Sequence, residues 1–454
     1  MRIALLVYRG NPRCGGQGVY VRYLSRALTE LGHSVEVFSG PPYPVLDPGV
    51  TLTRVPSLDL YRPDDPFRIP ARYEFRDLID VAEFATLCTA GFPEPLTFSL
   101  RVGRLLRRRL ADFDVIHDNQ GLGYGTLPLL RSGIPIVTTI HHPVTVDRTL
   151  DMAAATGVTK RLSTWRWYGF TRMQARVARR MPRVLTVSES SRRDLVTELG
   201  IDPTRLHLVR LGVDLERFRP LPEVARVRGR ILSTASADVP LKGLVHLVEA
   251  LATVRARRPD AHLVVVGRLR EHGTVEATIR RLGLGQWVRF ESDVSDHRLV
   301  ELYAEAEVAV VPSLYEGFSL PAVECMAAGC ALVASSAGAI PEVVGTEDEA
   351  ALLTPPADPA AIARAVLTVL DDPALRARLA RGGRERARRL FSWPACAAHT
   401  AAHYRAAMAE AAGLPPVAVL EPELAAPPAP LQGGAASLDP PHDGPGATVA
   451  DAVA

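Results

Sequence analysis

Two glutamates eight residues apart, Glu316 and Glu324, lie in the segment YEGFSLPAVEC at positions 315–325. The apolar run Val308–Val311 precedes this segment, and Pro321 lies inside it. The pattern predicts a buried strand, a tight loop that carries Glu316, and a helix with Pro321 in its first turn. The first N–H groups of such a helix favour an anion. The segment therefore indicates a ligand site, although one solvated glutamate and one ordinary first-turn glutamate would give the same pattern.

The spacing of the two carboxylates argues against a glycosidase-like acid–base pair. On a continuous helix, eight residues would separate the glutamates by about 12 Å along the axis. The paired carboxylates of glycosidases stand about 5 to 9.5 Å apart. Because the predicted loop breaks the helix, Glu316 and Glu324 can instead contact different parts of one ligand.

Two other segments have the residue types of an anion site. Lys242, in the sequence PLKG, follows a predicted strand and would place an ammonium beside an anion. Gly15, Gly16 and Gly18 follow the predicted first strand, Ile3–Val7, and let the backbone approach a ligand closely. Their spacing does not match the dinucleotide-binding fingerprint, and a purely structural turn is the alternative.

A histidine follows another predicted strand, Ile134–Ile140. Open α/β sheets bind ligands at the carboxyl ends of their strands, so His141 is a candidate site residue. A capping or hydrogen-bonding role is the alternative for this side chain. The adjacent His142 is expected to point elsewhere.

Apolar runs alternate with helical patterns through both halves of the chain, and Pro220 and Pro222 mark a boundary between the halves. The fold class is therefore α/β, with two doubly wound, Rossmann-like domains facing across a cleft. The segment Pro41–Pro70 shows little periodicity, whereas Arg72–Thr89 reads as a helix. The predicted parts are a first domain over 1–212, a second domain over 213–392, a C-terminal helix over 393–412 that crosses back toward the first domain, and a disordered tail over 413–454.

Composition excludes several classes of protein. The net charge of the 454 residues is only +3, so nothing demands a nucleic-acid partner. The five cysteines form no CxxC pair and no metal-ligand spacing, which predicts reduced thiols and a cytoplasmic chain. We expect no signal peptide and no transmembrane helix, because no apolar stretch of about 20 residues is uninterrupted.

One stretch leaves room for peripheral contact with the inner face of a membrane. Residues 160–180 combine four aromatic residues with seven Lys and Arg residues. A basic amphipathic helix of this kind can lie on an anionic membrane. A surface helix that packs its aromatic residues inward is the favoured alternative, and RNA binding is a weaker third reading.

Together these features suit a sugar nucleotide. Lys242, the helix start after Ser319 and the glycine loop would converge on a diphosphate, because all three favour an anion. A carboxylate such as Glu324 is well suited to accept hydrogen bonds from vicinal hydroxyls.

On these residues the chain resembles glycosyltransferase family 4, whose members have the GT-B architecture. The resemblance runs from about Met1 to Ala411. It rests on EGFSLPAVE as an E-x7-E motif, on PLKG, on the glycine loop GGQGV, on TIHH, on LGVD and on the FSW sequence that starts the last helix. Each of these motifs alone is weak, and the combination is highly specific.

The resemblance implies retaining transfer of a hexose-type sugar from a nucleotide-diphosphate donor to a hydroxyl acceptor, without a metal or other cofactor. The first domain would bind a small-molecule, glycan or lipid-linked acceptor, as in cell-envelope or glycolipid biosynthesis, and the second domain would bind the donor. The implied site residues are Glu324 at the ribose hydroxyls, Glu316 near the reacting centre, Phe318, Ser319 and Leu320 along sugar and phosphate, Lys242 at the diphosphate, Gly16 in the glycine loop and His141 beside the transferred sugar. His141, Lys242 and Glu316 are the implied catalytic residues.

One position departs from the family pattern. The family usually carries an arginine five residues before the diphosphate lysine, and here that position is Ala237. The loss removes one charge-assisted clamp, so either another arginine substitutes, with Arg268 as the candidate, or the activity is altered. The alternatives are a non-catalytic sugar-nucleotide-binding protein and a different GT-B enzyme such as a sugar-nucleotide epimerase.

Overall fold

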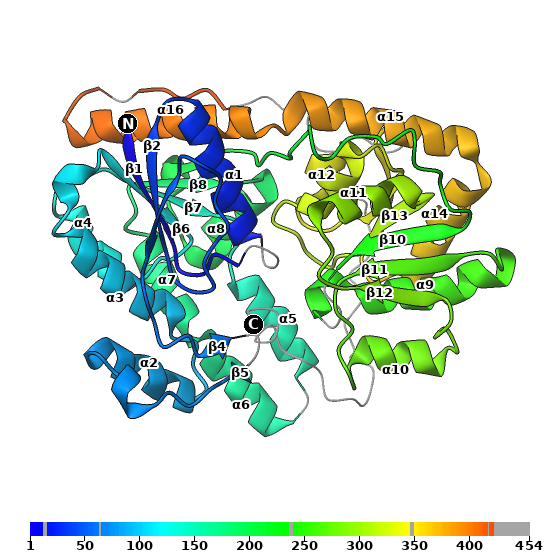
Figure 1. Ribbon diagram of the computed structural model, residues 1–454, viewed down its shortest axis with the longest axis horizontal. Helices are drawn as coiled ribbons and strands as arrows, with labels where there is room; N and C mark the ends of the chain where they lie inside the picture. The colour runs from blue at the N-terminus through cyan, green and yellow to red at the C-terminus, as the bar shows by residue number, and fades with distance from the viewer. Residues whose placement is uncertain are drawn as a thin grey trace.

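The computed structural model describes residues 1–11, 16–62, 65–155, 157–235, 239–345, 349–415 and 417–421. Two parallel β-sheets, each with helices on its faces, lie side by side (Figure 1). We call the seven-stranded sheet with its helices the N-domain and the six-stranded sheet with its helices the C-domain. The predicted α/β fold with two Rossmann-like domains is confirmed.

The N-domain sheet has the strand order β3-β2-β1-β6-β7-β8-β9, and its pairings are parallel. Its strands are β1 (Arg2–Val7), β2 (Ser34–Ser39), β3 (Thr51–Arg54), β6 (Val115–Asn119), β7 (Ile136–Ile140), β8 (Arg183–Thr186) and β9 (Leu206–Leu208). A separate hairpin pairs β4 (Tyr61–Arg62) with β5 (Asp65–Pro66). The helices are α1 (Gln17–Glu30), α2 (Leu78–Cys88), α3 (Glu94–Leu106), α4 (Leu127–Leu130), α5 (Thr145–Ala154), α6 (Val158–Trp167), α7 (Thr171–Ala178) and α8 (Glu189–Leu199).

The C-domain sheet has the order β12-β11-β10-β13-β14-β15, also with parallel pairings. Its strands are β10 (Arg230–Thr234), β11 (His262–Val266), β12 (Val288–Glu291), β13 (Val308–Val311), β14 (Leu332–Ser335) and β15 (Ala351–Thr354). The helices that follow are α9 (Leu244–Arg257), α10 (Thr274–Arg281), α11 (Asp296–Glu305), α12 (Leu320–Ala327), α13 (Ile340–Val344), α14 (Pro359–Asp371), α15 (Pro373–Leu390) and α16 (Trp393–Ala411). Strands β10 and β13 are neighbours, so the loops after them open at the same edge.

The last helix, α16, lies along the N-domain beside α1 (Figure 1). Its first residue, Trp393, stacks on Tyr23 of α1 with ring centroids 5.3 Å apart. Farther along, the Tyr404 hydroxyl lies 2.6 Å from Nδ1 of His117 on β6, and both side chains are buried. The N-domain core is therefore built from both ends of the chain.

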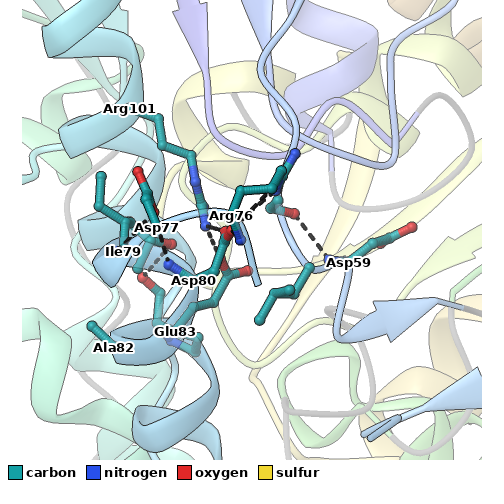
Figure 2. A network of polar contacts seen from close by, with 12 residues as sticks. Asp59, Arg76, Asp77, Ile79, Asp80, Ala82, Glu83 and Arg101 are labelled. Carbon is teal, nitrogen blue, oxygen red and sulfur yellow. Dashed lines mark hydrogen bonds and ion pairs between the residues drawn. The ribbon is translucent and has the colours of Figure 1, made fainter. Parts of the chain in front are cut away.

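Helix α2 is amphipathic, but it buries charged side chains and exposes an apolar one. Its buried residues include Asp80 and Glu83, whereas Leu78 is 82% exposed. Figure 2 shows the reason: the Arg101 guanidinium reaches both carboxylates, with Nη2 2.5 Å from Oδ1 of Asp80 and a shorter contact to Glu83. Arg76 adds a second partner for Asp80. Ion pairs, together with the buried Ile79, thus hold the inner face of α2.

We expect Arg101→Met to lower the free energy of unfolding by about 2 kcal/mol, because it leaves two buried carboxylates without their shared cation. The matched control is Arg104→Met, since Arg104 pairs with Asp77 on the surface with 57% of its side chain exposed. That change should cost no more than about 0.5 kcal/mol. Urea denaturation followed by circular dichroism measures both, and equal losses would contradict the role given to Arg101.

The basic aromatic stretch 160–180 forms parts of α6 and α7 rather than one helix. Trp167 and Tyr168 are buried, and Trp165 is 48% exposed. Among the described residues, no helix has the length and apolar character needed to cross a membrane. Within the predicted tail, Glu421 accepts a hydrogen bond from the Leu208 N–H at 3.0 Å, and residues 422–454 lie outside the described residues.

Candidate active site

The loop between β13 and α12 carries the first candidate residues, as predicted. Strand β13 ends at Val311, and α12 begins at Leu320 with Pro321 in its first turn. Ser319 precedes the helix with φ 83°, a left-handed conformation that is rare for a residue with a side chain. Its hydroxyl is buried and has no hydrogen-bond partner among the described residues. This loop is therefore a strained turn at a helix start, the kind of turn found at ligand sites.

Lys242 and Glu316 are brought together. The Lys242 ammonium lies 2.9 Å from Oε1 of Glu316, and the Ser313 hydroxyl donates to the same oxygen at 2.7 Å. The turn that carries Lys242 is fixed by the Leu314 N–H, which donates to the Leu241 carbonyl at 2.7 Å. The two loops after neighbouring strands thus present one cation and one carboxylate as a unit.

Glu324 is the second carboxylate of the predicted pair, and it is only partly exposed. Among the described residues, no group donates a hydrogen bond to its side chain. Burial raises the pKa of Glu324 to about 8, with the nearby Asp296 adding to the effect and Arg217 opposing it. The group therefore has free acceptor capacity for ligand hydroxyls, whose hydrogen bonds would favour its ionised form.

His141 lies at the end of β7 on the N-domain side. Its ring packs edge-on against Tyr20 at 4.7 Å, and its Nε2 is 2.8 Å from Oδ1 of Asn119. Burial lowers the pKa of His141 to about 3, so the ring is neutral and acts as a hydrogen-bonding group. Asn119 is not among the predicted site residues, although it is a polar residue at the carboxyl end of β6, next to β7, where open α/β sheets bind ligands.

The remaining predicted residues have differing surroundings. Gly16 precedes α1 with φ 72° and open space around its Cα, whereas Gly15 lies outside the described residues. Phe318 is buried and packs against Phe391 at 5.5 Å. Leu320 is partly buried against the same core. The side chains of Phe318 and Leu320 therefore anchor the loop, which leaves their backbone for a ligand.

The loop also docks on the N-domain through Gly317. Its carbonyl accepts hydrogen bonds from the hydroxyls of Ser188 at 2.7 Å and Ser191 at 3.2 Å. Ser188 also caps α8 by accepting from the Ser191 N–H. A Cβ at position 317 would lie 2.6 Å from the His141 carbonyl oxygen. Position 317 therefore has to be glycine for the two domains to meet.

A second contact between the domains was not predicted. The Glu342 carboxylate on α13 accepts from the backbone N–H groups of Glu189 and Ser190, at 2.7 and 2.6 Å. A carboxylate at a helix N-terminus is electrostatically favourable, so Glu342 holds the start of α8 against the C-domain.

We expect Gly317→Ala to lower catalytic efficiency about tenfold, because the added methyl would push the loop away from His141. The matched control is Gly285→Ala, since a Cβ there would meet nothing within 4 Å. Steady-state kinetics and thermal unfolding of both variants measure the effect. Equal activity of Gly317→Ala and Gly285→Ala would show that the contact is dispensable.

His142 points in a different direction from His141, as expected, but its side chain also lies beside the loop of the candidate site. Its ring lies 6.0 Å from the ring of Tyr315, and its Nε2 is 2.9 Å from Oδ2 of Asp147. The charges of Glu316 and Lys242 act on the pKa of His142, which Glu316 raises and Lys242 lowers. The side chain thus faces the same loop as the candidates on the C-domain.

Two other predictions concern the missing arginine. Ala237 lies outside the described residues. Arg268 pairs with Asp293 at 3.0 Å and is 77% exposed. Among the described residues, no contact joins it to Lys242 or Glu316. In the described part of the chain, no three His, Cys, Asp or Glu side chains group in a way that could hold a metal ion.

The chain is similar to several known proteins. Residues 14–217 match the family model described as Glycosyltransferase Family 4, and residues 224–386 match Glycosyl transferases group 1. The chain is 54% identical over 413 residues to the MMP alpha-(1->4)-mannosyltransferase of Mycolicibacterium hassiacum, covering 91% of this chain and 100% of the relative. It is 30% identical to D-inositol 3-phosphate glycosyltransferase 2 of Catenulispora acidiphila, covering 89% and 94%.

Solved structures show the same fold at lower identity. Sucrose-phosphate synthase from Thermosynechococcus elongatus superposes with a TM-score of 0.69 at 24% identity, over 89% of this chain and 98% of that one. Anabaena HepE, solved with UDP and glucose, has a TM-score of 0.65 at 18% identity, over 88% and 98%.

Proposed function

The chain belongs to glycosyltransferase family 4, and from that premise we propose that this glycosyltransferase moves a hexose, with mannose as the expected sugar, from a nucleotide-diphosphate donor to a hydroxyl acceptor with retention of configuration. The observation that carries the proposal is the ion pair between Lys242 and Glu316. The loop that carries Glu316 also leads toward Glu324 and docks on the N-domain. The relative at 54% identity supports mannose and an α-(1→4) linkage, which are the sugar and linkage in its name.

Each site residue has a role in this proposal. Lys242 would neutralise charge on the departing diphosphate, and Glu324 would accept hydrogen bonds from the ribose hydroxyls. Glu316 and the neutral His141 would flank the transferred sugar. The backbone of Gly16 and of 318–320 would line the phosphates and sugar, as the resemblance implies. Catalysis would then rest on positioning and leaving-group stabilisation, with no metal or other cofactor.

A donor panel tests the proposal. Purified protein is incubated with nucleoside-diphosphate sugars that differ in base and sugar, with 4-linked mannosides as acceptors and with or without EDTA. We expect one mannosyl donor to be consumed in an acceptor-dependent way, and NMR of the product to show an α-(1→4) linkage. A β-linked product would contradict retention, loss of turnover in EDTA would contradict the metal-free proposal, and no turnover of any donor would overturn the function.

We further propose that the enzyme works in the cytoplasm and touches an anionic membrane through residues 160–180. This range carries seven cations and no acidic residue. On α6, Leu162 is 63% exposed, and the exposed Trp165 is stacked by Arg172 at 5.2 Å. Flotation with anionic and with neutral vesicles tests the contact, and equal recovery with both would contradict it.

A further inference from the structure

His142 has surroundings that a simple packing residue would not need. Its Nε2 lies 2.9 Å from the Asp147 carboxylate in the first turn of α5, and Asp147 is itself buried. The Gln120 side chain donates to the His142 carbonyl at 2.9 Å and accepts from the His141 N–H at 2.8 Å. Both the ring and the backbone of His142 are therefore fixed in place.

The fixed ring faces the loop of the candidate site. A Cβ at Gly317 would lie 3.0 Å from Cβ of His142, and the ring of Tyr315 is 6.0 Å away. Helix α5, which carries Asp147, contacts the turn Pro240–Lys242. The His142 side chain is 29% exposed, which leaves part of the ring accessible to a ligand between the domains.

The site needs a second positive charge to bind a diphosphate. The Lys242 ammonium already contacts Glu316 at 2.9 Å, so the pair is neutral as a unit. A diphosphate carries at least two negative charges and is bound by several charge-assisted hydrogen bonds. The charged and titratable groups around His142 are Asp147 on α5, Tyr315 and Glu316 on the loop, Lys242 on its turn and His141 on β7.

We propose that His142, as an imidazolium paired with Asp147, supplies a positive charge that binds the donor diphosphate together with Lys242. This inference rests on the proposed function and names a residue that the sequence analysis set aside. Burial alone would lower the pKa of His142, but the Asp147 carboxylate, with a further contribution from Glu316, raises the pKa above its ordinary value. The imidazolium is therefore favoured over the neutral ring by the Asp147 carboxylate, and it is lost as the pH rises through the raised pKa.

The step that His142 assists is the departure of the nucleoside diphosphate. The bond between the anomeric carbon and the phosphate oxygen breaks, and its electron pair stays on the phosphate. The acceptor oxygen bonds to the anomeric carbon, and its proton passes to the departing phosphate. The imidazolium keeps its own proton throughout and stabilises the charge that develops on the phosphate.

The test is the pH dependence of kcat/KM for the donor. Wild-type activity should fall at alkaline pH, and this alkaline fall should vanish in His142→Gln, with an overall loss of about 10–100-fold. Asp147→Asn keeps the ring but removes the charge that raises its pKa, so the alkaline fall should move to lower pH. His142→Arg should retain activity at alkaline pH, because a guanidinium does not titrate there. His297→Gln, at an 82% exposed histidine, is the matched control and should behave as wild type.

A purely structural role for His142 would lower activity equally at every pH. The proposal is overturned if Asp147→Asn leaves the alkaline fall in place, if His142→Gln keeps it, or if wild type lacks it. Circular dichroism separates misfolded variants, and Asp147→Asn remains informative if His142→Gln fails to fold. If no donor is turned over at all, the proposed function fails, and the pH dependence of nucleoside-diphosphate binding by calorimetry still tests His142.

Discussion

Replacing Lys242 by alanine is expected to lower kcat/KM for the donor by about 10²–10³-fold. The change removes the ammonium that would stabilise the departing diphosphate. It also leaves Glu316, which is 8% exposed, with a buried charge and, among the described residues, only the Ser313 hydroxyl as a side-chain partner. Steady-state kinetics at saturating acceptor measure the loss.

The chain offers a strict control for this prediction, because Lys160 is its one other lysine. Lys160→Ala should keep full activity on a soluble acceptor. The same pair of lysines allows a chemical test, since a nucleoside diphosphate should protect Lys242 and not Lys160 from an amine-reactive reagent. Equal protection, or full activity of Lys242→Ala, would remove Lys242 from the site.

Glu324→Ala is expected to weaken binding of the donor and of the free nucleoside diphosphate about 10²-fold, because two hydroxyls lose a charged acceptor. The pKa of about 8 adds a second, independent expectation. At neutral pH the free enzyme holds a proton on Glu324, and ligand hydroxyls favour the ionised carboxylate. Glu324 should therefore release a proton on binding, and its ionisation, taken alone, should strengthen binding as the pH increases toward about 8.

Calorimetry in two buffers of different ionisation enthalpy measures this proton release directly. The signal should disappear in Glu324→Gln, which cannot ionise. Glu385→Gln, at an exposed position on α15, is the matched control and should release the same proton as wild type. A nucleoside diphosphate that binds Glu324→Gln with unchanged affinity would place the ribose elsewhere.

The sequence reveals the loop of the site because its signals are local. The apolar run Val308–Val311 and Pro321 predict the strand and the helix start that the structure contains. The approach of Lys242 to Glu316 follows from the pairing of β10 with β13, which an alternating α/β pattern suggests without fixing. Contacts from the other domain, such as Ser191 on Gly317, have no local signal and appear only in three dimensions.

Strand β3 and the inward face of α2 were missed for a similar reason. Strand β3 lies inside the segment Pro41–Pro70, where its four exposed or half-buried residues show no strand pattern. It forms only because β2 offers an open edge for pairing. For α2, the sequence pattern predicts the helix but not its buried face. The outward face carries the exposed Leu78, and the inward face holds Asp80 and Glu83. Only the position of Arg101 on α3 reveals which face is buried.

The position of α16 bears on how the protein is synthesised. The N-domain sheet is complete once β9 has left the ribosome, but the N-domain still lacks Trp393 and Tyr404, which cover Tyr23 and His117. Domains usually fold as they emerge, starting with the N-terminal one. Here the domain that is translated first must wait for almost the whole chain, up to Ala411, before its core can close. A nascent chain released early would therefore expose that core to chaperones and proteases.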